Sequence, residues 1–340
     1  FLLPEPGSCG NSTFADREIR CFIYHRFGAE SEYPSTSISK RLFERHLKYL
    51  EQNDYTVLTL GRALERLYSK GELPEKTAVL TIDDAYESIK EVALPLLNNY
   101  GYRATIFVPT GHVGTDNYLT WKELDTLRQQ GFEIGNHSHS HTHFVNFADK
   151  GLREKFEKDL EASHRLFQKH LDFTPKLYAY PFGEYCPRMA DILEEHGYRA
   201  AAAQKSGVVY RGSNRFALPR FPMNEHYGKM DMFQNKIGMH PLGVVDSNPG
   251  NPVVFKQNPP PLSLTVKNKE IDPAGIQCFV NGQRNCSITT SWKNSSLVVN
   301  VRSLRELQSR RTLYTVTAPS RGGGEWFWYS HVWILPEYGE

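Results

Sequence analysis

Two short segments contain the residues best suited to catalytic chemistry. Residues 81–86 read Thr-Ile-Asp-Asp-Ala-Tyr, so two adjacent carboxylates follow an apolar run. Residues 135–141 read Gly-Asn-His-Ser-His-Ser-His, which places His137 and His141 four positions apart after a second apolar run. One carboxylate and two imidazoles are a common ligand set for a divalent metal that keeps positions open for water and substrate. The other carboxylate remains available as a general base for that water, so the pattern predicts a metal-assisted hydrolase.

A second pair of histidines, His139 and His143, has the same spacing and offers a competing ligand register. The register with His137 and His141 is preferred, because Gly135 and Asn136 let the chain turn as it leaves the strand. Adjacent aspartates at a strand end often do no more than cap or solvate a loop. The combination of both motifs, each directly after an apolar run, instead favours one shared site.

Strand-like and helix-like stretches alternate through the first two thirds of the chain. Apolar runs predict strands at residues 19–24, 77–82, 104–109, 132–135, 176–180, 198–203 and 216–220. Apolar residues recur at helical spacing within residues 42–50, 92–97 and 152–167. The alternation predicts parallel strands with crossover helices, in an α/β barrel or a doubly wound sheet. Functional residues of such folds lie at the carboxyl ends of strands, and both motifs fall at predicted strand ends.

The composition of the chain changes after about residue 240. A segment rich in Pro, Gly and Asn is followed by short alternating strands, as in a small β-sandwich, at residues 262–266, 276–280, 287–292, 297–301, 313–317 and 326–334. We therefore expect four parts: an extension (1–17), an α/β domain (18–243), a linker (244–261) and a β-sandwich (262–340). Because both motifs precede the linker, a chain ending near residue 244 is expected to fold alone.

The overall composition is that of an ordinary globular protein. The chain has 340 residues, of which 39% are hydrophobic and 23% charged, and its net charge is +2. Basic residues are dispersed, so we expect no nucleic-acid partner. No apolar run approaches the roughly 20 residues of a membrane helix, so we expect no transmembrane segment. The chain begins with Phe1 rather than Met, which is compatible with a leader that has been removed.

The five cysteines fall into two groups. Cys278 and Cys286 flank an Asn-Gly pair that signals a hairpin turn, so they either form a disulfide across two strands or remain separate thiols. Cys9, Cys21 and Cys186 lack metal-ligand spacing and are expected to be incidental thiols.

Taken together, the motifs resemble those of the polysaccharide deacetylases of carbohydrate esterase family 4, the NodB-homology group. The first family motif, Thr-Phe-Asp-Asp-Gly, is matched by residues 81–85, and the second, His-Ser/Thr-x-x-His, by residues 137–141. The third, Arg-x-Pro-Tyr/Phe, is matched by Ala-Tyr-Pro-Phe at 179–182. The similarity covers residues 18–243 and implies a distorted (β/α)7-type barrel, here followed by a small all-β sandwich domain.

The resemblance also implies roles for individual residues. Asp83 would be the catalytic base, and Asp84, His137 and His141 would bind the metal. The backbone N–H of Phe182 would stabilise the oxyanion. Four further residues would contact the substrate: His25, Tyr86, Tyr180 and Pro181.

The proton donor for the leaving amine is harder to assign. In the family it is a late histidine in a Leu-x-His type of motif, which has no clear match here. His240 is the positional candidate and His226 is its rival.

Two departures from the family pattern affect the expected function. Ala85 replaces a glycine, and Ala179 replaces an arginine that orients the catalytic aspartate in many members. Loss of that arginine is tolerated in the branch that acts on poly-N-acetylglucosamine, which residues 21–27 also resemble.

The resemblance therefore implies an extracytoplasmic enzyme that removes acetyl groups from a polymer of N-acetylglucosamine. Zinc is the expected metal, and cobalt, nickel or iron would also suit the ligands. Two alternatives remain: a catalytically weak, metal-containing carbohydrate-binding protein, and a deacetylase of a small or lipid-linked amide. The sequence gives no indication of oligomeric state.

The aromatic end of the second domain has two interpretations. Trp326, Phe327 and Trp333 could contact glycan, because aromatic rings stack on sugar faces. Alternation along a strand instead predicts that Trp326, Trp328 and Val332 share one face and build the sandwich core.

Overall fold

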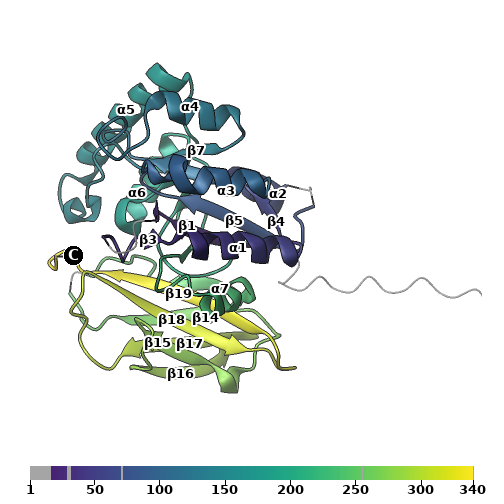
Figure 1. Ribbon diagram of the computed structural model, residues 1–340. Helices are drawn as coiled ribbons and strands as arrows, with labels where there is room; N and C mark the ends of the chain where they lie inside the picture. Colours follow the sequence, from purple (N-terminus) through teal and green to yellow (C-terminus); the bar gives the residue numbers. More distant parts are fainter. Residues whose placement is uncertain (1–16, 29–31, 70–71, 255, 340) are drawn as a thin grey trace, which may run out of the picture.

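A curled sheet wrapped by helices forms the first part of the protein (Figure 1). The computed structural model describes residues 17–28, 32–69, 72–254 and 256–339, so Cys9 and nearly all of the expected N-terminal extension lie outside the described residues. The strands of the sheet are β1 (Glu18–Tyr24), β4 (Thr56–Leu58), β5 (Thr77–Ile82), β6 (Thr105–Val108), β7 (Glu133–Asn136), β8 (Leu177–Ala179), β9 (Ala200–Ala202), β10 (Val209–Tyr210) and β11 (Phe221–Pro222). Their neighbours run in the order β10-β1-β5-β6-β7-β8-β9, with β11 beside β1 and β4 beside β5.

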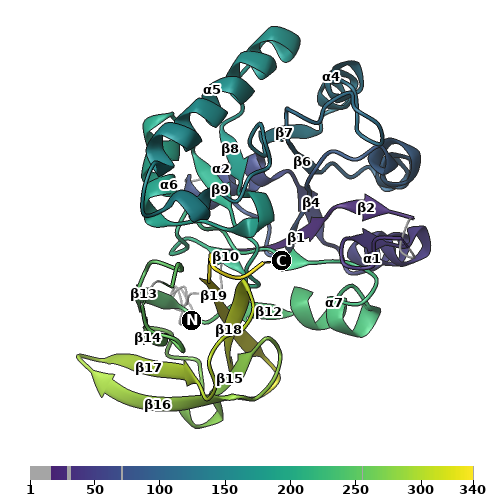
Figure 2. The same ribbon diagram turned by 90° about the vertical axis from the view of Figure 1, so that its left-hand side faces the viewer.

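Helices connect these strands and cover the outside of the sheet (Figure 2). They are α1 (Lys40–Gln52), α2 (Leu60–Tyr68), α3 (Leu94–Asn99), α4 (Trp121–Gln129), α5 (Leu152–Leu171), α6 (Pro187–Glu195) and α7 (Met230–Ile237). A short parallel pair, β2 (Arg26–Phe27) and β3 (Ser37–Ile38), follows β1. The alternation predicted from the sequence is confirmed, and the architecture is the expected distorted barrel.

The strands read as continuous apolar runs because both of their faces are covered. Every residue of β1 and of β5 is buried. The pairs β1–β5, β5–β6, β6–β7, β7–β8 and β8–β9 are all parallel. The carboxyl ends of these strands therefore meet at one edge of the sheet, which is where the two sequence motifs begin.

The second domain is a sandwich of two four-stranded sheets. One sheet has the order β12-β19-β18-β15 and the other β13-β14-β17-β16. The strands are β12 (Met239–Pro241), β13 (Val244–Asn248), β14 (Pro261–Val266), β15 (Gln277–Val280), β16 (Cys286–Lys293), β17 (Ser296–Ser303), β18 (Arg311–Pro319) and β19 (Trp326–Ile334). All six strands expected after residue 261 are confirmed. Alternate residues of β14 and β17, including Leu264 and Val299, form the apolar layer between the sheets.

The boundary between the two domains differs from the expected one. Residues 244–248 form β13 within the segment expected to be a linker, and β12 leaves the barrel segment to pair with β19. Both are edge strands, where the prolines that suggested a linker are tolerated. The expected strand at 216–220 is reduced to a bridge between Leu218 and Ala202, and β11 follows it.

The two domains also share apolar packing. Val332 and Ile334 of β19 belong to a buried cluster that includes Phe156 and Tyr178 of the barrel. A chain ending near residue 244 would expose this surface, so the independent folding of the first domain stays a prediction, and an insoluble truncated chain would contradict it.

Cys278 and Cys286 form a disulfide between β15 and β16. The intervening Asn281 and Gly282 both have positive φ, at 47° and 80°, as the hairpin signal predicts. Cys21 and Cys186 are buried free thiols. Within the described part of the chain, none of the helices has the length and apolar character needed to span a membrane.

Candidate active site

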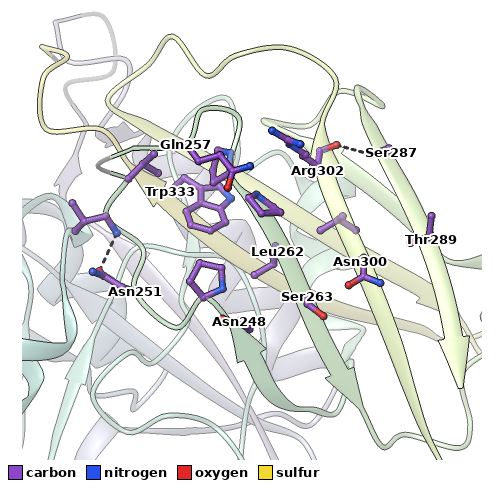
Figure 3. Close-up of a pocket in the computed structure, with 16 residues that line it drawn as sticks. Asn248, Asn251, Gln257, Leu262, Ser263, Ser287, Thr289, Asn300, Arg302 and Trp333 are labelled. Carbon is purple, nitrogen blue, oxygen red and sulfur yellow. Dashed lines mark hydrogen bonds between the residues drawn. The ribbon is translucent and has the colours of Figure 1, made fainter. Parts of the chain in front are cut away.

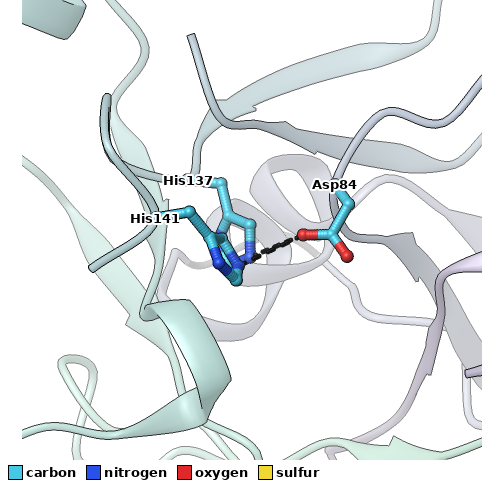
Figure 4. A group of neighbouring side chains, drawn as sticks. All are labelled: Asp84, His137 and His141. Atoms are coloured by element: carbon cyan, nitrogen blue, oxygen red, sulfur yellow. Dashed lines mark ion pairs between the residues drawn. The ribbon is translucent and has the colours of Figure 1, made fainter. Parts of the chain in front are cut away.

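Three side chains from the two motifs converge at the carboxyl edge of the barrel (Figure 4). Asp84 follows β5, and His137 and His141 follow β7. Asp84 Oδ1 lies 3.4 Å from His137 Nε2 and 3.3 Å from His141 Nε2. The three ligand atoms all lie within 4.8 Å of one another. One carboxylate oxygen and two imidazole nitrogens directed at a common point are the donor set that the sequence predicted.

The backbone at the first motif explains the glycine of the family pattern. Asp84 has φ 73° and Ala85 has φ 58°, both in the left-handed region. Glycine adopts this conformation without steric cost, whereas alanine does not. Ala85 is fully buried, so its surroundings hold it in this conformation. The substitution leaves the turn intact and adds local strain of the kind that clusters at functional sites.

Hydrogen bonds hold the loop between the two histidines. The backbone N–H of His141 donates to Ser138 Oγ at 2.8 Å. Asp159 of α5 accepts from the backbone N–H groups of His139 and Ser140, at 2.7 and 2.9 Å. The turn itself uses positive φ at Ser138 and His141, at 69° and 50°.

Gly135 has a different function from the one expected. Its φ is not positive, and a Cβ there would come within 2.4 Å of the ring of Phe107. The glycine therefore permits close packing of neighbouring strands rather than a turn.

The structure favours the expected register over its competitor. His139 Nδ1 is hydrogen-bonded to Thr110 Oγ1 at 3.0 Å, and His143 Nδ1 to Glu184 Oε2 at 2.9 Å. Within the described residues, the one group of His, Cys, Asp or Glu side chains that could hold a metal is formed by Asp84, His137 and His141.

The environment of these residues fits a divalent metal. His137 donates from Nδ1 to the backbone oxygen of Ala179 at 2.8 Å, which directs its Nε2 toward Asp84. Burial would raise the pKa of Asp84, but its contacts with His137 and His141 hold that pKa well below its ordinary value. The carboxylate is therefore ionised, as a metal ligand must be.

Asp83 lies beside this group and is held by an arginine that sequence reasoning missed. Arg220, the last residue of the predicted strand at 216–220, donates from Nη1 to Asp83 Oδ1 at 2.7 Å and from Nη2 to Oδ2 at 2.9 Å. Its side chain is completely buried. Burial would raise the pKa of Asp83, yet the charge and hydrogen bonds of Arg220 lower it. Arg220 thus contacts the carboxylate that the missing arginine at position 179 was expected to orient, and its position at a predicted strand end was the available signal.

Phe182 lies beside His141. It is the second residue of a short 3-10 turn, Pro181–Gly183, and has φ 57° and ψ 5°. The first amides of such a turn have no acceptor within it, so the N–H of Phe182 is available to a ligand. The ring of Phe182 meets that of His141 edge-on, with centroids 4.6 Å apart.

Three further side chains surround the centre. His25, directly after β1, lies close enough to Asp84 and Asp83 for their charges to raise its pKa, although burial outweighs them and lowers it. Tyr86 lies at the rim, with the guanidinium of Arg26 3.4 Å from its ring centroid. His112 was not expected from the sequence, and it lies near enough to His141 and Asp84 to feel their charges.

Two of the expected substrate contacts are not available to a substrate. Tyr180 is fully buried and donates its hydroxyl to the backbone oxygen of Phe216 at 2.9 Å. Pro181 is buried as well. Both residues therefore shape the turn that carries Phe182 instead of lining the open site.

His240, the expected proton donor, lies at the wrong end of the barrel. Its Nδ1 is 3.0 Å from Glu18 Oε2, and Glu18 is the first residue of β1, whereas His25 follows the last. A strand of seven residues spans roughly 20 Å, so His240 cannot reach the site. His226 is exposed, and its ring contacts that of Tyr227.

The second domain has a separate cavity of about 650 Å³, lined by residues of its own strands and of the segment before β14 (Figure 3). Trp333 forms part of its wall but is only 1% exposed, and Phe327 is buried too. Trp326 remains 37% exposed. Phe327 and Trp333 belong to the core of the sandwich. The expectation that Trp326, Trp328 and Val332 build that core is wrong, because Trp328 and Val332 pack on the barrel side of β19.

Comparisons with known proteins agree with this geometry. The family model of polysaccharide deacetylases matches residues 70–201. A poly-beta-1,6-N-acetyl-D-glucosamine N-deacetylase of Staphylococcus aureus is 30% identical over 216 residues, covering 60% of this chain and 73% of that protein.

Two solved structures share the fold. Streptococcus pyogenes deacetylase PplD, in complex with acetate, has a TM-score of 0.58 and 21% identity, over 65% of this chain and 98% of its own. IcaB from Ammonifex degensii has a TM-score of 0.57 and 23% identity, over 64% of this chain and 97% of its own. The relative from Staphylococcus aureus, together with the match to the family model, shows that the chain belongs to the polysaccharide deacetylase family.

Proposed function

We propose that this protein is a metal-dependent amide hydrolase that removes acetyl groups from N-acetylglucosamine units of an extracellular polysaccharide. The convergence of Asp84, His137 and His141 beside Asp83 is the observation that carries the proposal. The name of the Staphylococcus aureus relative supports a polymer of the poly-N-acetylglucosamine type. The Cys278–Cys286 disulfide supports an oxidising compartment outside the cytoplasm.

Asp84, His137 and His141 would hold the metal through one oxygen and two nitrogens. This set suits zinc, and also cobalt, nickel or iron. Zinc bound there would polarise the acetyl carbonyl and lower the pKa of water.

Asp83 is the proposed general base. Its low pKa keeps the carboxylate ionised, and the two hydrogen bonds from Arg220 fix its orientation. Asp83 Oδ2 lies 3.9 Å from His137 Nε2. A water between this carboxylate and the metal ligands would therefore lie within hydrogen-bonding reach of Asp83. Asp83 would take a proton from this water as the water oxygen attacks the acetyl carbon.

Two groups would complete the reaction. The N–H of Phe182 would donate to the oxyanion that forms on the acetyl oxygen. As the C–N bond breaks, the proton taken up by Asp83 would pass through His25 to the sugar nitrogen, yielding acetate and a free amine. We assign this step to His25 because it lies beside both aspartates, whereas His240 is at the far end of β1.

The alternative of a catalytically weak binding protein rested on the missing arginine at position 179 and on the unassigned proton donor. Arg220 supplies the positive charge to Asp83, which removes the first of these arguments. A deacetylase of small or lipid-linked amides would use the same residues as a polysaccharide deacetylase. Only a measurement of substrate preference separates these two functions.

The proposal can be tested with β-1,6-linked N-acetylglucosamine oligomers and monomeric N-acetylglucosamine, by measuring acetate release with zinc-loaded protein. We expect release from the oligomers, rising with their length, and little from the monomer. Comparable release from monomer and oligomers would contradict a polymer substrate. His25→Ala should lower kcat while metal binding is retained, and His240→Ala should leave kcat unchanged.

A further inference from the structure

Phe182 has a backbone conformation that it would not adopt unaided. Its φ of 57° lies in the left-handed region, where a bulky residue other than glycine is strained. Pro181 restricts the chain before it, and Gly183 packs against Gln204 so closely that a Cβ would come within 2.1 Å of that side chain. The surrounding structure must therefore hold Phe182 in place, and much of that structure comes from the second domain.

The backbone of Phe182 is held by Arg311, the first residue of β18. Arg311 donates from Nη1 to the backbone oxygen of Phe182 and to Gln204 Oε1, the latter at 2.8 Å. The contact fixes the peptide group that follows Phe182. With the preceding residue restricted by its proline ring, the residue is held on both sides, and its own N–H has a defined direction.

The ring of Phe182 is held through a relay that also starts in the second domain. Arg310 donates from Nε and Nη2 to the two carboxylate oxygens of Glu184, at 2.7 and 2.9 Å. Glu184 Oε2 accepts from His143 Nδ1 at 2.9 Å. The ring of His143 stacks on that of Phe182, with centroids 3.6 Å apart and planes 9° from parallel.

The relay is buried, so its geometry is tightly set. Glu184 is 2% exposed and Arg310 is 6% exposed. Arg310 also donates to Asn146 Oδ1 at 2.7 Å, on the loop that carries His143. Charge-assisted pairs with two parallel hydrogen bonds combine strength with directional precision. The ring of Phe182 also meets that of His141 edge-on, so the relay ends at a residue of the candidate metal centre.

We propose that Arg311 and Arg310 are positioning residues, through which the β-sandwich holds the Phe182 amide in the direction needed for the oxyanion. The inference rests on the proposed function for the role of that amide. In this view the second domain is part of the catalytic apparatus, and the deacetylase barrel is incomplete without it.

The test compares Arg311→Ala with Arg321→Ala in the full chain. Arg321 is a matched control, because it follows the far end of β18 from Arg311 and also donates to a backbone oxygen, that of Lys269. We expect Arg311→Ala to increase amide hydrogen exchange in residues 180–185 of the metal-free protein. With zinc and an oligomeric substrate it should lower kcat about 10-fold or more, with little change in KM, since the loss affects the transition state. Arg321→Ala should change neither quantity.

Unchanged hydrogen exchange in Arg311→Ala, or a loss confined to KM, would overturn the inference. If Arg311→Ala does not fold, His143→Ala removes the ring stack without disturbing the domain contact, and it should raise exchange in the same segment. If the unmodified protein releases no acetate, the proposed function fails, while the exchange measurement still tests whether Arg311 holds the turn.

Discussion

Arg220 and Asp83 are separated by 137 positions in the chain, and their side chains form two hydrogen bonds at 2.7 and 2.9 Å. Both side chains are buried, so the pair is desolvated as a unit. The arginine also donates to Thr81 Oγ1 at 3.0 Å and to the backbone oxygen of Ala203 at 3.1 Å. The carboxylate proposed as the base is therefore oriented and charge-compensated from a different strand of the barrel.

Removing this arginine should cost considerable stability. Arg220→Met leaves the carboxylate of Asp83 buried without its partner, and breaking a buried pair in this way costs about 3–5 kcal/mol. Denaturant unfolding of the metal-free protein measures the loss. The double variant Asp83→Asn/Arg220→Met should be more stable than Arg220→Met, because it no longer buries an unpaired charge. Equal stability of the two variants would show that the charge is compensated by another group.

The adjacent aspartates should have separable functions. Asp83→Asn is expected to retain zinc and to lose about 10²–10⁴-fold in kcat, because the amide cannot accept a proton. Asp84→Asn should instead weaken zinc binding, which competition with a chromophoric chelator measures. Exchanged phenotypes would reverse the two assignments while leaving the site in place.

The histidines of the loop after β7 provide an internal comparison. His137→Ala and His141→Ala should each abolish stoichiometric zinc binding, since a site with two protein ligands is weak. His139→Ala should retain zinc, because the side chain of His139 is hydrogen-bonded to Thr110 instead. Metal analysis of the purified variants decides the matter. Full occupancy in His137→Ala or His141→Ala would mean that the register is wrong.

The stability of the metal-free protein should fall as the pH is lowered from 6.5 to 4.5. Burial lowers the pKa of His46 to about 4 and that of His331 to about 3. The unfolded chain therefore binds more protons in this range, and protons favour unfolding. His137 acts in the opposite sense, because Asp83 and Asp84 outweigh burial and raise its pKa.

For His46 alone the full effect is on the order of 3 kcal/mol. Thermal unfolding across this pH range in the presence of chelator measures the total. His331→Leu should reduce the pH dependence, because leucine binds no proton. The substitution loses no hydrogen bond at Nε2, which has no partner among the described residues. A melting temperature that does not fall between pH 6.5 and 4.5 would contradict this account.

The sequence was sufficient to locate the candidate metal ligands, but not the residues that orient the neighbouring carboxylate. Asp84, His137 and His141 could be located because each motif directly follows an apolar strand, and parallel strands bring their carboxyl ends together. Arg220 could not be assigned, because its contact with Asp83 depends on how β11 aligns with β1. His240 was misplaced for a related reason: its position in the chain does not reveal which end of the barrel it reaches.

The boundary between the two domains was also only partly predictable from the sequence. The six sandwich strands were predicted from alternation, which is clearest in β14 and β17, where one face packs in the core. β12 and β13 were missed because both are edge strands in a segment rich in proline and glycine. The burial of Tyr180 also depends on a partner distant in the chain, the backbone oxygen of Phe216.

Acetate release is expected to depend on a metal held by Asp84, His137 and His141. The most direct measurement is a titration of chelator-treated protein with zinc, in which bound zinc and acetate release from N-acetylglucosamine oligomers are measured in the same samples. We predict that activity is absent without metal, rises in proportion to bound zinc and saturates at one ion per chain. Acetate release that persists in the metal-free protein, or that does not follow zinc occupancy, would contradict the claim.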